Sequence, residues 1–186
     1  MPHLTVQIAA EAHAPDGSKT PVPPALALQL RGPIVQVSVG VEQNIAHQLL
    51  QQGLTPPAPI TGVALIDTEA SVTCIDDGAA QILKLPAIDV VTVASASHAA
   101  SPQNVYPIQV DVAGLPITIS APRAIGASLA AQGVLLLIGR DVLQQCTLFY
   151  NGPAGLFSLS VLVRACMRPM EPQVRAKLNI ARAAGS

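Results

Sequence analysis

The residues best suited to chemistry in this chain lie in the segment 64–71, whose sequence is ALIDTEAS. An apolar run ends there in the carboxylate of Asp67, which a hydroxyl residue, Thr68, and a second acid, Glu69, follow. A carboxylate at the end of a core strand is costly unless another group shares or solvates its charge. The economical partner is a second copy of the same turn, because two carboxylates in contact share one proton and titrate as a unit. Such a pair can hydrolyse peptide bonds, since its ionised member takes a proton from a bound water while its protonated member polarises the carbonyl.

A second segment with a related pattern lies further along the chain. The apolar run 134–138 ends abruptly at Gly139, Arg140 and Asp141, and a short helix is expected at residues 142–145. Many β proteins contain such a pair of interrupted strands, so this near-repeat is weak by itself. A chain of this length carries one acidic turn of the first kind, so the second carboxylate of a pair must come from another molecule.

The composition predicts one domain with a core made of aliphatic side chains. The 186 residues, 50% hydrophobic and 11% charged, are enough for a domain of ordinary size with tails. Aromatic residues are scarce, so Val, Ile, Leu and Ala must fill the core, and the β-branched residues among them favour sheet. The net charge of −1 provides no field that gathers nucleic acid. We therefore expect no nucleic-acid partner.

The cysteines and the N-terminus bear on the compartment. Cys74, Cys146 and Cys166 lack metal-ligand spacing, so we interpret them as reduced thiols and expect no metal or other cofactor. The N-terminus has no basic region followed by an apolar one, and the run 134–138 is far too short to span a bilayer. These features predict a cytoplasmic protein with no membrane segment. The sequence also has no Gly-rich phosphate loop and no Gly-x-Ser-x-Gly elbow.

The pattern of apolar residues predicts mostly strands and a few short helices. Residues 43–54 carry apolar positions at helical spacing, with Gly53 as the stop. Asp76 or Asp77 can cap a short helix through residue 83. Strands are expected at residues 4–8, 25–30, 34–39, 63–66, 88–97, 105–120, 134–138, 148–150 and 156–160.

Together, the two motifs resemble those of the retropepsin-like aspartic proteases, the single-lobe family that includes retroviral proteases and bacterial relatives. The family pattern is an apolar strand with Asp-Thr/Ser-Gly-Ala-Ser/Asp, a flap hairpin, and then two apolar residues with Gly-Arg-Asp/Asn before a short helix. The matching residues are 65–71 and 137–143, and the resemblance covers residues 25–162. It implies an all-β, closed β-barrel lobe with one or two short helices that works as a homodimer. The chain then divides into an N-terminal arm or linker (1–24), the protease domain (25–162, with residues 43–54 as an inserted helix) and a basic C-terminal tail (163–186).

The resemblance also implies a role for each matching residue. Asp67 corresponds to the catalytic aspartate, of which each subunit supplies one. Thr68 corresponds to the hydroxyl residue that hydrogen-bonds across the dimer axis. Ala70 and Ser71 correspond to the floor under the substrate backbone. The tip of the flap corresponds to Ala96, Ser97 and His98. The structural motif beneath the site corresponds to Gly139, Arg140 and Asp141.

One position departs from the family pattern, because Glu69 stands where the family has glycine. Glycine there lets backbone approach the substrate and the partner loop, since it has no Cβ. In a dimer the glutamate brings four carboxylates to one axis, so we expect it to reduce or abolish proteolysis; an exposed turn glutamate without effect is the other interpretation. The predicted function is an aspartic endopeptidase that cuts extended peptides. The alternative is a catalytically inactive peptide-binding or dimerisation module with the same fold.

Simpler interpretations remain open for several of these residues. Asp67 can be a turn residue that caps the segment after it. His98 can be a solvated loop histidine rather than a substrate contact, and Arg140 can anchor structure through hydrogen bonds rather than touch substrate. Cys74 with a distant histidine could imitate a thiol protease, although nothing in the sequence places the two together.

Overall fold

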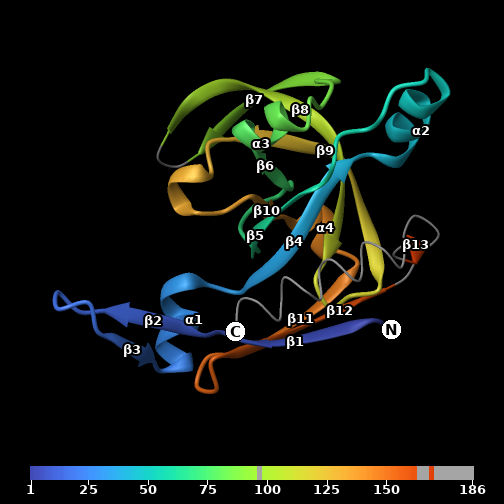
Figure 1. Cartoon of the computed structure of the whole chain (residues 1–186). Helices are drawn as coiled ribbons and strands as arrows, with labels where there is room; N and C mark the ends of the chain where they lie inside the picture. Colours follow the sequence, from blue (N-terminus) through green and yellow to red (C-terminus); the bar gives the residue numbers. More distant parts are fainter. Residues whose placement is uncertain (96–97, 163–167, 170–186) are drawn as a thin grey trace.

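The structure, a computed structural model, describes residues 1–95, 98–162 and 168–169 and consists mainly of a closed β-barrel (Figure 1). Six strands form the ring in the order β9-β6-β10-β5-β4-β8, and the pairing of β8 with β9 closes it. The predicted all-β closed barrel is confirmed. The strands of the ring are β4 (Ile34–Val41), β5 (Ile60–Ile66), β6 (Cys74–Asp76), β8 (His98–Val112), β9 (Ile117–Ala127) and β10 (Leu136–Ile138). Outside the ring, β7 (Asp89–Ser95) pairs with β8, and β13 (Arg168–Pro169) pairs with β9.

Aliphatic side chains fill the barrel, as the composition predicts. At the start of β4, Val35 and Val37 are buried while Gln36 between them is exposed, which is the alternation expected of a strand with one inward face. Branched side chains pack well on such a pleated surface. The most deeply buried residues of the ring include Val37, Val39, Ile75, Ile108, Leu136 and Ile138.

A second, smaller sheet lies below the barrel in Figure 1. Its strand order is β1-β12-β11, with all pairs antiparallel. The N-terminal residues thus add an edge strand, and a separate two-stranded hairpin of β2 and β3 follows it. These strands are β1 (His3–Gln7), β2 (Ala10–His13), β3 (Lys19–Val22), β11 (Cys146–Asn151) and β12 (Leu156–Val161).

The segment 25–30, which we expected to be a strand, is helical. Pro24 at the first helical position and Gly32 after the last turn, with φ of 70°, mark its ends. Ala27 and Leu28 are both buried, so the Ala-Leu alternation that suggests a strand also supplies the inward face of one short helix. In the described residues there are four α-helices and one 3₁₀ helix, more than the one or two short helices expected: α1 (Pro24–Arg31), α2 (Gln43–Gln51), α3 (Asp77–Ile82), α4 (Arg140–Leu143) and η1 (Ala130–Gln132).

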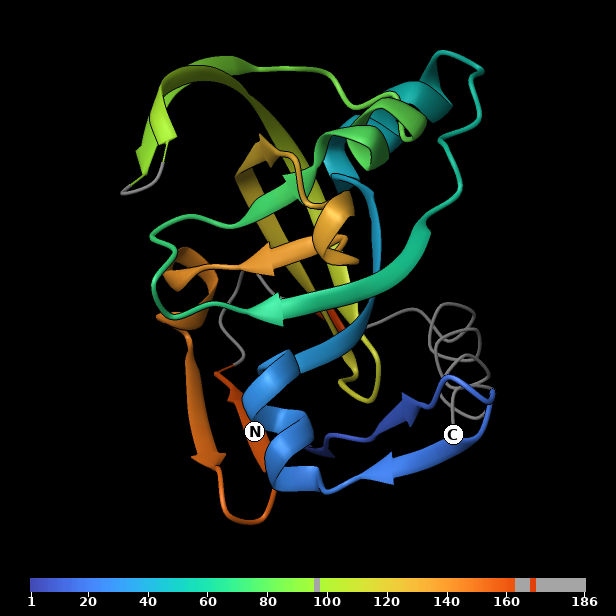
Figure 2. The same ribbon diagram turned by 90° about the vertical axis from the view of Figure 1, so that its left-hand side faces the viewer.

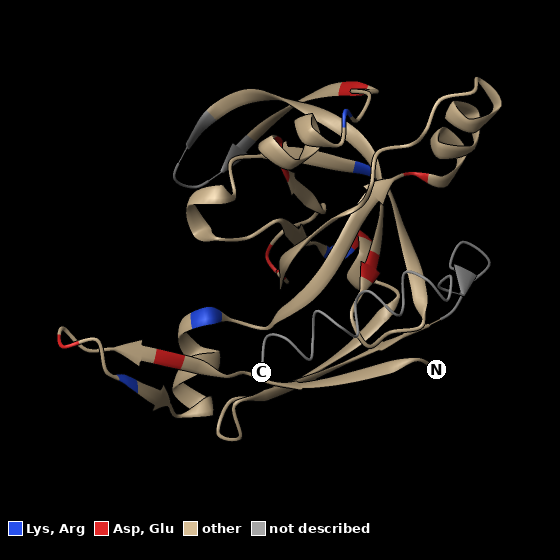
Figure 3. Ribbon diagram, viewed as in Figure 1, with Lys and Arg blue, Asp and Glu red and all other residues tan. Residues whose placement is uncertain are grey.

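The expected strand 105–120 is in fact two strands of a hairpin. β8 ends at Val112 and β9 begins at Ile117, with Gly114 at φ of 87° in the turn between them. An L-residue adopts such a φ only with strain, so the glycine was the sequence signal for the break. No helix in the described ranges is long and apolar enough to cross a membrane. Charged residues are dispersed over the described ribbon rather than gathered on one face (Figure 3).

Candidate active site

The barrel brings the two sequence motifs side by side. β5 and β10 pair in parallel, with Ala64 opposite Leu136 and Ile66 opposite Ile138. The backbone N–H of Asp67 donates to the carbonyl of Ile138 at 3.0 Å, so the acidic turn and Gly139 leave the sheet at the same edge. Neither motif alone predicts this adjacency.

The turn itself holds the carboxylate of Asp67. The side chain is half-buried, and its Oδ1 accepts from the backbone N–H of Glu69 at 2.8 Å and of Ala70 at 3.1 Å. Two amide donors on one oxygen fix the orientation of the carboxyl group. Both bonds fall on Oδ1, so the capping interpretation of Asp67 and a catalytic role are compatible.

Arg140 clamps this turn from the neighbouring motif. Its Nη1 donates to the carbonyl oxygens of Thr68 at 2.8 Å and Glu69 at 3.0 Å, and its backbone N–H donates to Ala70 at 2.9 Å. The side chains of Thr68, Glu69 and Ser71 are exposed. Arg140 therefore holds three successive carbonyls in place while the outer surface of the turn faces solvent in the single chain.

The backbone of the turn does not require glycine at position 69. Among the described non-glycine residues, Lys84 is the one with positive φ, so Glu69 sits in a conformation that side chains readily adopt. Its backbone N–H and carbonyl are both hydrogen-bonded, to Asp67 and Arg140. Glu69 therefore causes no backbone strain within the subunit. Any effect it has on activity must come from its exposed side chain.

Beneath the turn lies a hydrogen-bond network that the sequence analysis did not predict. Thr73 is 1% exposed, and its hydroxyl donates to Oδ1 of Asp141 at 2.8 Å and accepts from the backbone N–H of Gly139 at 3.2 Å. The same Oδ1 also accepts from the backbone N–H groups of Thr73 and Val142. The available signal was a lone hydroxyl two residues before the buried Ile75, at an inward position of an otherwise apolar segment.

The thiol of Cys74 lies close to this network but is not activated. Burial, and then the nearby carboxylates of Asp141 and Asp67, raise its pKa to about 11. A catalytic cysteine needs a lowered pKa, because the thiolate is the nucleophile. The thiol stays protonated at neutral pH, which argues against a thiol protease. Burial likewise raises the pKa of Cys146 to about 11, and Cys166 lies outside the described residues.

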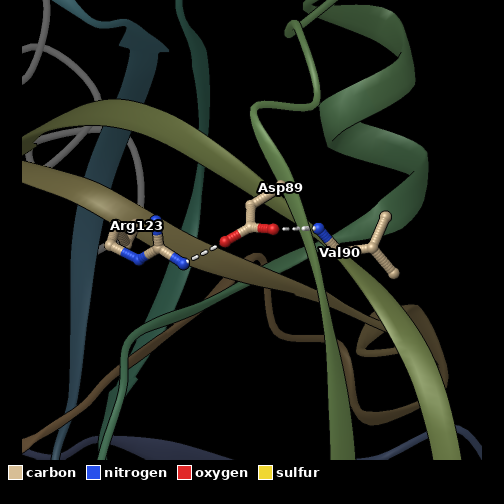
Figure 4. A network of polar contacts seen from close by, with 3 residues as sticks. All are labelled: Asp89, Val90 and Arg123. Carbon is tan, nitrogen blue, oxygen red and sulfur yellow. Dashed lines mark hydrogen bonds and ion pairs between the residues drawn. The ribbon is translucent and has the colours of Figure 1, made fainter.

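A cavity of about 760 Å³ opens beside the turn, between β7, β9 and α4. Ser71 and Asp141 belong to its lining, so the cavity is continuous with the motifs described above. At its margin, Arg123 on β9 forms an ion pair with Asp89 on β7 (Figure 4). The hydrogen bond from Arg123, and then that from the Val90 N–H, lower the pKa of Asp89. The apolar part of the lining consists of Val72, Val91, Val93, Val105, Ala121, Pro122, Ile125 and Val142.

The segment in which a flap was expected forms the hairpin of β7 and β8. These strands pair from Asp89 opposite Val105 to Ser95 opposite His98, with a register shift between Val93 and Ser95. The hairpin extends from the barrel as a curved ribbon (Figure 2). His98 is the first residue of β8, whereas Ala96 and Ser97 of the expected tip lie outside the described residues.

No group of three or more histidine, cysteine, aspartate or glutamate side chains in the described part of the chain could hold a metal ion. The candidate site consists of the Asp67 carboxylate on a braced turn, beside a partly apolar cavity. Chemically it can act as one half of an acid pair, with the other half supplied from outside the chain.

Comparisons with known proteins give a likeness to a solved structure but none in sequence. No model of a known protein family matches the chain, and no curated protein is significantly similar to it in sequence. Among solved structures, the chain is similar to the crystal structure of a retropepsin-like aspartic protease from Rickettsia conorii, with 14% identity and a TM-score of 0.40, over 84% of this chain and 90% of that chain. A likeness at this level decides neither the fold nor the function, both of which rest on the strand pairing and side chains described above.

Proposed function

We propose that this protein is a retropepsin-like aspartic endopeptidase that works as a homodimer, with Asp67 of each subunit forming the catalytic pair. The observation that supports this most is the parallel pairing of β5 with β10, since it sets the Asp67 turn against Gly139 and Arg140. One acidic turn of this kind per chain makes the second subunit necessary. In the dimer, Thr68 would hydrogen-bond across the axis and lock the two turns together.

The geometry of the turn suits the chemistry of such a pair. Oδ1 of Asp67 is held by the amides of Glu69 and Ala70, and neither bond uses the second oxygen, which in this proposal contacts water and substrate. Two such carboxyl groups a few Å apart share a proton, so one acts as general base toward water and the other as general acid toward the carbonyl. No metal or other cofactor enters this reaction.

The substrate in this proposal is an extended peptide. Its backbone would lie over Ala70 and Ser71, and the hairpin of β7 and β8 would close over it as a flap. Side chains that alternate along an extended peptide need pockets at the same spacing. The cavity beside Ser71 supports this arrangement, because its valine-rich wall suits an apolar side chain.

We also propose that the enzyme works in the cytoplasm. The two cysteines in the described part of the chain, Cys74 and Cys146, are both free. Free thiols persist in reducing compartments. The assignment to the cytoplasm rests on these free thiols.

Turnover of a mixed peptide library near pH 5, where one carboxyl of a pair can hold a proton, tests the proposal. We expect cleavage products and inhibition by a pepstatin-type compound. The second candidate, an inactive peptide-binding or dimerisation module, is favoured by the exposed acid of Glu69 next to Asp67. Peptide binding without turnover under these conditions would support the module and contradict the enzyme.

Glu69→Gly is expected to raise peptide turnover by about tenfold or more. General acid–base catalysis typically accelerates a reaction by about 10²–10⁴-fold, and a bulky side chain beside the pair would reduce this acceleration. The substitution removes a side chain and a charge that both face the partner turn. The backbone conformation of Glu69 is open to glycine, at a cost of roughly 0.5–1 kcal/mol in stability. Initial rates on the peptide library measure the change.

Glu69→Gln is the matched control for this prediction, because it keeps the size of the side chain and removes its charge. If peptide turnover rises in both variants, the charge of Glu69 is what limits turnover in the parent chain. If turnover rises in Glu69→Gly alone, the size of the side chain is what limits it. Equal rates in the parent chain and in Glu69→Gly would show that residue 69 is an indifferent turn residue.

Removing the charge of residue 69 is expected to tighten the dimer. Four carboxylates from two Asp67 and two Glu69 residues would crowd one axis, and like charges at that distance repel. Glu69→Gln removes two of the four charges, so the dissociation constant of the dimer should fall. Sedimentation of the parent chain and of Glu69→Gln in the same buffer measures it. Equal dissociation constants would remove the case for crowded carboxylates.

A further inference from the structure

We infer that the outer face of α1 is part of the contact between two copies of this chain, an inference that rests on the homodimer proposed above. The turn that carries Asp67 exposes Thr68, Glu69 and Ser71, but three small patches of side chain are too little for a stable interface. Specific interfaces bury on the order of 800 Å² on each partner. The contact must therefore extend from the turn onto its neighbours.

α1 is a neighbour of the end of β5 that leads into the turn. The carbonyl of Pro33, just after the helix, accepts from the backbone N–H of Ile66 at 3.0 Å. A Cβ at Gly32 would lie 2.8 Å from Cδ1 of Leu65, so the end of the helix packs directly on β5. The last turn of α1 thus lies next to the residues that precede Asp67, and Figure 2 shows the helix directly below the end of β5 on the same face.

The outward side of α1 is apolar. Leu26 is 43% exposed and Leu30 is 71% exposed, while Ala27 and Leu28 face the core. Residues four apart share one face of a helix, so the two leucines form one stripe. The helix carries a single charged residue, Arg31, whose Nη1 donates to the carbonyl of Ala9. In the proposed homodimer, this apolar stripe would lie in the contact between the two copies.

The position of α1 is also fixed firmly enough to serve as an interface. At its N-terminal end, a Cβ on Gly155 would lie 2.1 Å from the backbone carbon of Pro24, so the turn between β11 and β12 packs tightly there. Arg31 ties its other end to the segment between β1 and β2. Preorganised surfaces lose less entropy on association.

A second copy of the chain fits this surface better than an unrelated partner. In a two-fold dimer the same patch lies on both subunits, so a patch beside the axis meets its own copy. The two Asp67 turns must meet at that axis, and α1 adjoins the turn. Leucine against leucine is self-complementary, whereas a charged surface would repel its copy.

Leu30→Glu in the full chain tests the inference by sedimentation velocity near pH 5 over a range of concentrations. We expect the dimer dissociation constant to rise at least about tenfold, because two buried glutamates would face each other across the axis. Leu30→Ala should weaken the dimer less. Leu50→Glu is the matched control, since Leu50 is 58% exposed and is likewise the penultimate residue of its helix, α2. Circular dichroism establishes that each variant is folded.

The outcomes separate this inference from the proposed function. If Leu30→Glu and Leu50→Glu have the same dimer dissociation constant, the α1 interface is overturned and the enzyme proposal stands. A dimer that Leu30→Glu weakens, in a protein that cleaves no peptide, would support the interface and contradict the enzyme. A parent chain that is monomeric at every concentration would overturn both.

Discussion

Asp67→Asn is expected to abolish peptide hydrolysis, with a loss of kcat on the order of 10³-fold or more, because the acid–base pair can no longer exchange a proton. The asparagine Oδ1 can still accept from the N–H groups of Glu69 and Ala70, which now hold the aspartate. The turn should therefore keep its conformation, and the thermal midpoint should change little. Turnover of the peptide library and thermal unfolding measure the two effects separately.

Asp16→Asn is the matched control for that variant. Oδ1 of Asp16 accepts from the backbone N–H of Ser18 at 2.9 Å, so it performs the same kind of turn capping without any link to the site. It should retain full turnover. If Asp67→Asn hydrolysed peptides as fast as Asp16→Asn, Asp67 would be a capping residue and the proposed chemistry would be wrong.

Gly139→Ala is expected to destabilise the fold by about 3 kcal/mol, at the upper end of what overpacking usually costs. A Cβ there would lie 2.5 Å from the backbone carbon of Val72, 2.7 Å from its oxygen and 2.8 Å from the nitrogen of Thr73. These are backbone atoms, so no side chain can rotate away to make room. The movement would break the hydrogen bond from Gly139 to Thr73 and displace Arg140 from the Asp67 turn. Urea unfolding measures the loss.

Gly152→Ala provides the comparison for this substitution. A Cβ at Gly152 would have its nearest neighbour at 3.7 Å, an ordinary van der Waals distance, in the turn of the β11–β12 hairpin. We expect its free energy of unfolding to stay within about 0.5 kcal/mol of the parent value. Similar unfolding curves for the two alanine variants would show that Val72 and Thr73 can shift freely, against the tight packing described here.

Local patterns in the sequence predicted much of the barrel. The branched residues of 34–39 and the run before Asp67 became β4 and β5, and the helical spacing of residues 43–54 became α2. Those patterns are reliable because alternation and helical periodicity report which face of an element is buried. The prediction of a strand at 25–30 was wrong because alternating Ala and Leu fit both the strand period and the helix period. The end residues Pro24 and Gly32 and the burial of Ala27 and Leu28 favour the helix.

For the candidate site, the sequence by itself determined which residues form the acidic turn and that one chain supplies a single such turn. Only the tertiary structure decided that Arg140 clamps Thr68, 72 residues away, and that Thr73 and Asp141 share a buried network. The physical reason is that the conformation of a turn depends on residues adjacent in the sequence, whereas strands pair through backbone groups that nearly every residue has. Which strands meet, and in what register, therefore depends on how the whole barrel buries its side chains.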